Sequence, residues 1–339
     1  MGLPNISFSK EDIYEHLEFS DKIKTKIIDL KKKVYKNKNT WQYEYLELIE
    51  ETIDDLLINK LDDLQIIKQK FLAIKDLAKT NCPTKKKKNC KCNVCKNNGI
   101  LSSFSSKIQS AFGYSHEIMR KYFLDNGIKT CYICNAQYAI VAQKDYFRRS
   151  KNNHKRKVYK KSYKYQLQKE NRLKFQLDHY LPKSLFPSFS LSLGNLYPIC
   201  SYCNGKKSNK VLDIKEMHNN ISFKLNVNSI KQYYTGKGSF ELELSDLTSN
   251  IENNKLSNIF DLKGIYDNHL DVIEDLFERK VKYTKSYKSV LAKAFPGIVG
   301  TSRAIDDRLI LGTYSKADGF YKRPLSKFIH DINDQLNSL

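Results

Sequence analysis

The chain has 339 residues, of which 40% are hydrophobic, and a formal net charge of +22. This length allows a sizeable core and two or three domains. No apolar run reaches the ~18 residues of a membrane span, and Met1 to Phe8 lack the basic and apolar regions of a signal peptide. We therefore expect a cytoplasmic protein with no membrane partner, in which clustered cysteines favour metal binding over disulfides.

Residues 1–80 are predicted to be an N-terminal helical region. Ser9 and Asp12 are spaced like a capping box that opens a helix. From 41 to 79, apolar side chains recur every three or four positions, as on one buried face of a helix. We interpret this stripe as a core face, and an interface with a second chain is the alternative.

Residues 81–125 are predicted to be a basic, cysteine-containing linker followed by a helix. Four consecutive lysines, residues 85–88, stand among the cysteines Cys82, Cys90, Cys92 and Cys95. The last two have the spacing of a zinc knuckle. A second zinc site is therefore one interpretation, and a basic loop with free thiols is the other.

Residues 126–215 contain two further Cys-x-x-Cys pairs, Cys131 with Cys134 and Cys200 with Cys203. Four thiolates in two such pairs provide the soft ligands and tetrahedral geometry of a closed structural zinc site. The site would join the two ends of this region across a loop of more than sixty residues. We therefore predict one structural Zn²⁺ here.

Residues typical of a hydrolytic metal site lie between these pairs. The run Phe175 to Leu177 is strand-like, so Asp178 and His179 stand at a strand end. A carboxylate binds hard divalent cations, and an imidazole can take a proton from water near pH 7. Asn204 directly follows the last zinc-knuckle cysteine, and its amide oxygen would complete the cation site of Asp178.

The order of these residues resembles the HNH endonucleases, which have the ββα-metal fold. The pattern is Asp178-His179, then Asn195, then Asn204-x-x-Lys-Ser, enclosed by the two cysteine pairs, and it covers roughly residues 128–215. The resemblance implies that His179 is the general base and that Asp178 and Asn204 hold one Mg²⁺ or Mn²⁺ against the scissile phosphate. It also implies that Asn195 braces the loop between the two strands and orients His179.

A basic insertion, residues 144–174, precedes Asp178. It contains 13 Lys/Arg and two acidic residues, interleaved with aromatic residues, and residues 81–215 carry the whole charge excess, with 28 Lys/Arg and six acids. Basic side chains neutralise phosphates and aromatic rings stack on bases. We interpret the insertion as a DNA-gripping loop, and a mobile solvated loop is the alternative. The residues assigned to nucleic-acid binding are Arg148, Arg149, Arg156, Lys157, Lys206 and Lys207.

Residues 216–339 are predicted to be an α-rich scaffold. The alternation of Phe240, Leu242 and Leu244 predicts one strand, in what could be a short hairpin. Residues 265–294 are expected to be helical, and residues 323–327 precede a final amphipathic helix.

Together these patterns predict an α+β protein, a mostly α-helical chain with a central zinc-stapled ββα-metal core. The expected function is that of a metal-dependent endonuclease that hydrolyses DNA phosphodiester bonds. A non-catalytic zinc module that binds DNA and recruits a partner is the alternative. The layout also loosely resembles nuclease subunits that work with an ATPase partner in Septu-like phage-defence systems, with type II restriction enzymes and homing nucleases as further alternatives.

Overall fold

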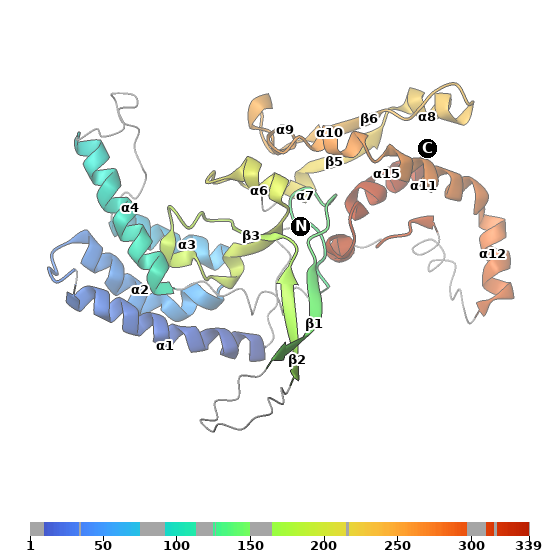
Figure 1. Cartoon of the computed structure of the whole chain (residues 1–339). Coiled ribbons are helices and arrows are strands. Elements are labelled where there is room, and N and C mark those ends of the chain that lie inside the picture. The colour runs from blue at the N-terminus through green and yellow to red at the C-terminus, as the bar shows by residue number, and fades with distance from the viewer. Residues whose placement is uncertain are drawn as a thin grey trace.

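The computed structural model describes most of the chain: residues 10–33, 35–74, 92–112, 125, 127–149, 165–214, 217–296, 310–314 and 317–338. This part is mostly helical and contains three two-stranded antiparallel sheets. N-terminal helices and a C-terminal region lie on either side of a central unit, as the ribbon in Figure 1 shows. The predicted α+β character of a mostly helical chain is confirmed at this level.

The N-terminal helices are α1 (Lys10–Lys33), α2 (Trp41–Ile58), α3 (Leu61–Ile74) and α4 (Asn93–Phe112). The apolar stripe expected from 41 onward is a core face, since Tyr45, Leu57 and Phe71 are buried. The stripe is divided between two helices because Asn59 has extended backbone angles and ends α2. Ser9 and residues 75–91 lie outside the described residues.

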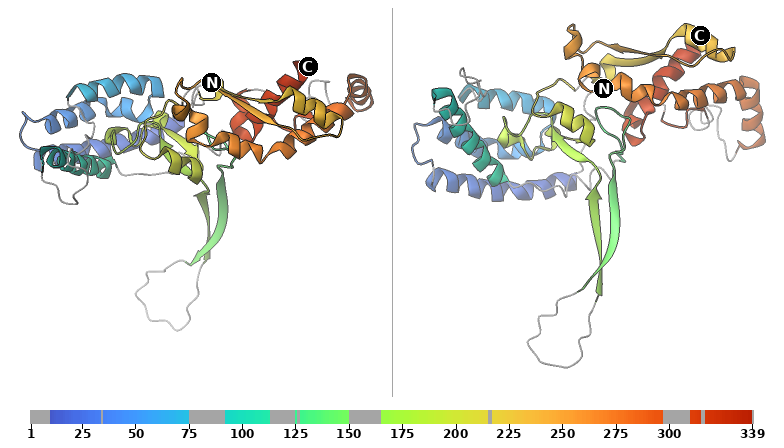
Figure 2. Two further views of the ribbon diagram at one scale, coloured as in Figure 1. Left: turned by 90° about the horizontal axis from the view of Figure 1, so that it is seen from above. Right: turned by 45° about the horizontal axis from the view of Figure 1, so that its top comes forward.

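Part of the basic insertion is a β-hairpin and not a loop, which corrects the sequence interpretation. Strands β1 (Val141–Arg149) and β2 (Tyr165–Leu173) pair antiparallel over nine residues each. The hairpin projects from the body of the molecule in both views of Figure 2. The sequence pattern missed it because its mixed polar residues lack the apolar alternation of a half-buried strand. Arg148 and Arg149 end β1, whereas Arg156 and Lys157 lie outside the described residues.

The C-terminal region combines a second hairpin with helices. Strands β5 (Ile221–Leu225) and β6 (Leu242–Asp246) pair antiparallel, so the expected strand is confirmed and gains a partner. The final helix α15 (Ser326–Ser338) packs on β5, where the Gln335 side chain exchanges two hydrogen bonds with the backbone of Leu225 at 2.7 and 2.8 Å. The other helices are α7 (Met217–Asn220), α8 (Val227–Tyr234), α9 (Leu256–Ile259), α10 (Leu262–Asp267), α11 (Leu270–Lys282) and α12 (Lys285–Ala294).

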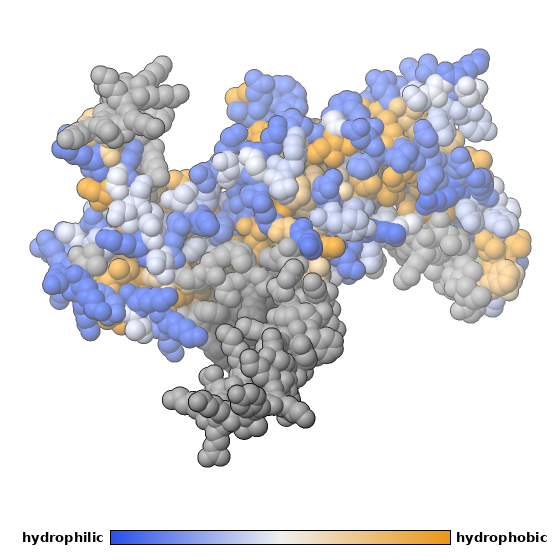
Figure 3. All heavy atoms as spheres, in the orientation of Figure 1, coloured by the Kyte–Doolittle hydropathy of each residue, from blue (hydrophilic) through white to orange (hydrophobic). Residues whose placement is uncertain are grey.

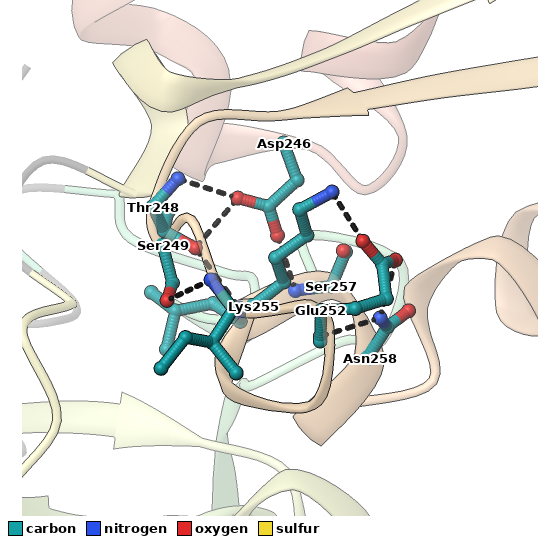
Figure 4. Close-up of polar contacts among 9 residues, drawn as sticks. Asp246, Thr248, Ser249, Glu252, Lys255, Ser257 and Asn258 are labelled. Atoms are coloured by element: carbon teal, nitrogen blue, oxygen red, sulfur yellow. Dashed lines mark hydrogen bonds and ion pairs between the residues drawn. The ribbon is translucent and has the colours of Figure 1, made fainter.

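The turn between β6 and α9 is held by the buried carboxylate of Asp246. It accepts hydrogen bonds from the backbone N–H groups of Thr248 and Ser257, both at 2.7 Å (Figure 4). The second of these groups belongs to the first turn of α9, so the carboxylate also satisfies a helix N-terminus. This turn leads the chain to Asp261, which contacts the central unit as described below.

Polar side chains cover much of the face seen in Figure 3, and apolar ones gather mainly over the C-terminal region. On α11 and α12, Val281 and Val290 are exposed. Within the described residues, none of the helices has both the length and the apolar character needed to cross a bilayer.

Candidate functional site

The central unit is a small ββα arrangement. Strand β3 (Gln176–His179) pairs antiparallel with β4 (Leu196–Ile199), and helix α6 (Ser201–Lys207) follows directly. The helix begins where the Cys200 side chain, at the N-cap, accepts a hydrogen bond from the Cys203 backbone. Such caps satisfy the free N–H groups at a helix start. The second cysteine pair therefore also sets the start of α6.

The four cysteines Cys131, Cys134, Cys200 and Cys203 form one cluster, whose sulfur atoms all lie within 4.8 Å of one another. Tetrahedral zinc with bonds of ~2.3 Å would place its sulfur ligands about 3.8 Å apart, close to this arrangement. The Tyr132 backbone N–H donates to the Pro198 carbonyl at 2.9 Å, which attaches the first cysteine turn to β4. These residues could hold a metal ion such as zinc.

Proton sharing inside the cluster separates the acidities of its thiols. Burial raises the pKa of Cys131, whereas hydrogen bonds from Cys131, Cys134 and Cys203 lower the pKa of Cys200. A lowered thiol pKa favours the thiolate, which is the form of cysteine that binds a metal.

Asp178 lies on the β3 face that α6 covers. Its Oδ2 atom accepts hydrogen bonds from the Tyr197 hydroxyl at 2.6 Å and from the Lys207 ammonium at 2.8 Å. Within the described part of the chain, no side chain or backbone group bonds to the other oxygen, Oδ1. The Asp178 side chain is 13% exposed, and Oδ1 is the oxygen left to take a cation.

Asn204 lies on the same surface as Asp178. Its amide donates to the Gln176 side chain at 2.5 Å. Gln176 and Asp178 are two positions apart in a strand, and Asn204 and Lys207 are three apart in a helix, so each pair shares a face. The two predicted cation ligands are thus near one another, although no direct bond joins them among the described contacts.

His179 belongs to the opposite environment, because successive strand residues alternate in direction. The side chain is 5% exposed, and its Nε2 donates to the Ser190 carbonyl at 3.0 Å. A carbonyl only accepts, so the neutral ring carries its proton on Nε2 and its lone pair on Nδ1. Burial lowers the pKa of His179 to about 4, and this ring is therefore neutral at pH 7.

Asn195 braces the connection between β3 and β4, the position that the family resemblance implied for it. Its side-chain oxygen accepts from the Leu181 backbone at 2.7 Å, and its amide donates to the carbonyls of Leu181 and Phe189 at 3.1 and 2.9 Å. The side chain is fully buried. Asn195 fixes the loop that presents the Ser190 carbonyl, so its effect on His179 is indirect.

The N-terminal helices support this same loop from outside. The Tyr45 hydroxyl on α2 bonds to the Ser188 hydroxyl at 2.9 Å, and the rings of Phe71 and Phe189 meet edge to face at 5.6 Å. Gly194 lies against the junction of α2 and α3, where a Cβ atom would come within 2.9 Å of the Leu61 nitrogen. The position of His179 therefore depends on packing with distant helices.

Two lysines of α6, Lys206 and Lys207, were predicted to bind DNA, but the structure gives each of them a protein partner. The prediction for Lys207 is wrong, because its side chain is fully buried and bonds to Asp178 and to the His179 carbonyl, the latter at 2.9 Å. Lys206 is 42% exposed but forms an ion pair with Asp261 at 2.6 Å. A phosphate would have to compete with this carboxylate for Lys206.

The second predicted zinc site falls partly outside the described residues. Cys82 and Cys90 are not described. Cys92 and Cys95 lie at the start of α4, where the Cys95 backbone N–H donates to the Cys92 sulfur at 3.4 Å. A second zinc stays a prediction.

The sequence patterns did not identify Gln176, Ser190 and Tyr197 as hydrogen-bond partners of the predicted site residues. They also did not predict that Lys207 is buried. The spacing Asn204-x-x-Lys207 could have indicated this position of Lys207, because residues three apart lie on the same side of a helix. The site combines a carboxylate and an amide on one surface of β3 with a neutral imidazole, that of the next strand residue, in a different environment. Comparisons with protein-family models, with curated proteins and with solved structures gave no match.

Proposed function

We propose that this chain is a metal-dependent endonuclease of the HNH type that hydrolyses phosphodiester bonds of DNA. The observation that supports this most directly is the ββα unit that carries Asp178, His179 and Asn204 and whose helix starts at the second pair of the four-cysteine cluster. The proposal assigns a hydrolytic role to the first three and a structural zinc to the cysteines.

The donor atoms fit a hard divalent cation. Asp178 would bind Mg²⁺ or Mn²⁺ through Oδ1, and Asn204 through its amide oxygen, since both cations prefer oxygen ligands. A bound cation supplies Lewis acidity to a phosphate oxygen. With only two protein ligands, most remaining positions would go to water and substrate, as is usual for Mg²⁺.

His179 would act as the general base. Its Nδ1 atom would take a proton from the water that attacks phosphorus, as the new P–O bond forms and the bond to the leaving sugar oxygen breaks. The Ser190 carbonyl favours the tautomer that this step needs. A phosphate beside the ring would stabilise the imidazolium that results. His179 would therefore be a stronger base with the substrate bound than in the free protein.

DNA is the proposed substrate because of charge. The +22 excess lies within residues 81–215, the segment that also contains the ββα unit and the projecting hairpin. Phosphate neutralisation would supply affinity with little dependence on sequence. A role in phage defence beside an ATPase subunit stays a prediction from the sequence layout.

The test is plasmid nicking with Mg²⁺ or Mn²⁺, comparing wild-type protein with His179→Ala and with His330→Ala, a histidine on α15. We expect His179→Ala to lose on the order of 10²–10⁴-fold in rate, because the base would be missing. The control should cleave like wild type, and zinc content by mass spectrometry should match in all three. Equal cleavage by His179→Ala would refute the assignment.

A non-catalytic DNA-binding module is the second candidate. The ion pair between Lys207 and Asp178 favours it, because that carboxylate already has a positive partner without any metal. This candidate predicts tight DNA binding with no divalent-dependent cleavage by the wild-type protein.

A further inference from the structure

Lys207 is a charged side chain in an unusual place. Its exposed fraction is 0%, and its ammonium group contacts the Asp178 carboxylate at 2.8 Å and the His179 carbonyl at 2.9 Å. The Lys207 ammonium therefore contacts both parts of the proposed active site. It reaches the side chain of the cation ligand Asp178 and the backbone carbonyl of the proposed base His179.

A buried ion pair is weak evidence for stability. Removing two charges from water is unfavourable, and apolar residues of similar volume often stabilise a protein as well or better. A helix whose only task was to cover β3 could use a leucine or methionine at this position. A lysine at this position is better explained by what its charge does to Asp178.

Both polar contacts that the described residues make with the Asp178 carboxylate fall on the same oxygen. Oδ2 receives both Lys207 and the Tyr197 hydroxyl, at 2.8 and 2.6 Å, and Oδ1 receives no bond from the described residues. A carboxylate held in this way presents one oxygen, so it can bind a cation through a single atom but cannot chelate it through both. The ammonium also places a positive charge beside any cation bound there.

We propose that Lys207 is a positioning residue that makes Asp178 a one-oxygen ligand and keeps the catalytic divalent cation weakly bound. This inference rests on the proposed function. Loss of an outer partner of a metal ligand ordinarily weakens metal binding, because that partner is neutral or anionic. Lys207 is a cation, so its removal has the opposite effect on affinity while still disturbing the geometry needed for cleavage.

The experiment measures Mn²⁺ binding to the zinc-loaded protein without DNA, by calorimetry or electron paramagnetic resonance. Lys207→Met should bind Mn²⁺ about tenfold more tightly, because one repelling charge is removed. At saturating Mn²⁺, its cleavage rate should fall about 10- to 100-fold. Adding Asp178→Ala to this variant should abolish the tight site, which shows that the cation binds at Asp178.

Lys206→Met is the matched control. It removes the same charge one position away on α6, from a side chain that pairs with Asp261 and not with Asp178. Its Mn²⁺ affinity should stay close to that of the wild-type protein. An equal gain in both variants would overturn the proposal, because net charge alone would then explain the effect.

Zinc content and a thermal unfolding curve report whether each variant is folded. If Lys207→Met loses zinc, Lys207→Gln removes the charge but keeps a hydrogen-bonding side chain, and the same tighter Mn²⁺ binding is expected. Unfolding of both variants would overturn the proposal in favour of a purely structural ion pair, as would unchanged or weaker Mn²⁺ affinity in a folded variant. Failure of the proposed function is distinct, since wild-type protein would then show neither Asp178-dependent Mn²⁺ binding nor cleavage.

Discussion

Acid should destabilise this protein through two buried histidines. His179 donates to the Ser190 carbonyl, and His218 on α7 donates to the Tyr132 carbonyl at 2.6 Å, with its ring edge-on to Tyr132 at 5.6 Å. Burial lowers the pKa of each imidazole from 6.5 to about 4. Both rings are neutral in the folded state at pH 7.

The direction of the pH effect on stability depends on whether the folded or the unfolded chain binds more protons. Between pH 6.5 and 4 the unfolded chain takes up protons that the folded chain does not, so lowering the pH favours unfolding. The contribution of each histidine is fully present above pH 6.5 and is lost as the pH falls toward 4. With these pKa values, each histidine should remove about 2 kcal/mol of unfolding free energy between pH 7 and pH 5.

Urea denaturation of the zinc-loaded protein at pH 7, 6 and 5 would measure this loss. Cysteine ligands also take up protons in acid, so the informative quantity is the difference between wild type and His218→Gln at each pH. The variant should be less stable than wild type at pH 7, but its loss of unfolding free energy between pH 7 and 5 should be about 2 kcal/mol smaller. A pH dependence identical to that of wild type would show that the His218 imidazole is not kept neutral by burial.

Three further predictions concern metal, DNA and packing. Cys200→Ser should remove one zinc equivalent and unfold the central unit, measured by mass spectrometry and circular dichroism, because structural zinc contributes folding energy directly; a stable zinc-free variant would contradict this. Charge reversal in the insertion should weaken binding to all DNA sequences and flatten the salt dependence, whose slope is about −0.9 per phosphate contacted; an unchanged slope would place the DNA path elsewhere. The positions to reverse are Arg148, Arg149, Arg156 and Lys157. Gly194→Ala should destabilise the protein by about 1–3 kcal/mol in urea denaturation and slow cleavage, since the new methyl group meets the α2–α3 junction; wild-type stability would show that the helices yield freely.

The sequence predicted the local parts of the site well because their information is local. Two Cys-x-x-Cys pairs specify a tetrahedral cluster wherever the chain brings them together. The strand-like run predicted from Phe175 to Leu177 corresponds to β3, which continues through His179. Asp178 and Asn204 were expected to share one cation site. Their placement on one surface follows from the alternation of side chains along β3 and the spacing of residues along α6.

Other features depend on contacts that no local pattern contains. A lysine in a basic segment normally lies in solvent, so the buried Lys207 was assigned to DNA. The sequence of the β1–β2 hairpin lacks the regular apolar alternation that predicts a strand. The contact of Gly194 with the α2–α3 junction joins residues more than 130 positions apart, and nothing in the residues near Gly194 indicates that partner.

The size of the ββα unit explains why it has helical flanks. Its strands have four residues each and its helix seven, which is too little to bury a core without support. Cysteine thiolates with a metal would join its two ends, and the flanks close its sides. On one side α2 and α3 hold the loop of Ser190, and on the other Asn135, next to the first cysteine pair, bonds to the carbonyl of Phe320 at 2.8 Å and receives the Leu325 N–H at 2.7 Å. Since these contacts fix the loop whose Ser190 carbonyl holds His179 and the turn of the first cysteine pair, the flanking regions stabilise the fold and also set the geometry of the proposed site.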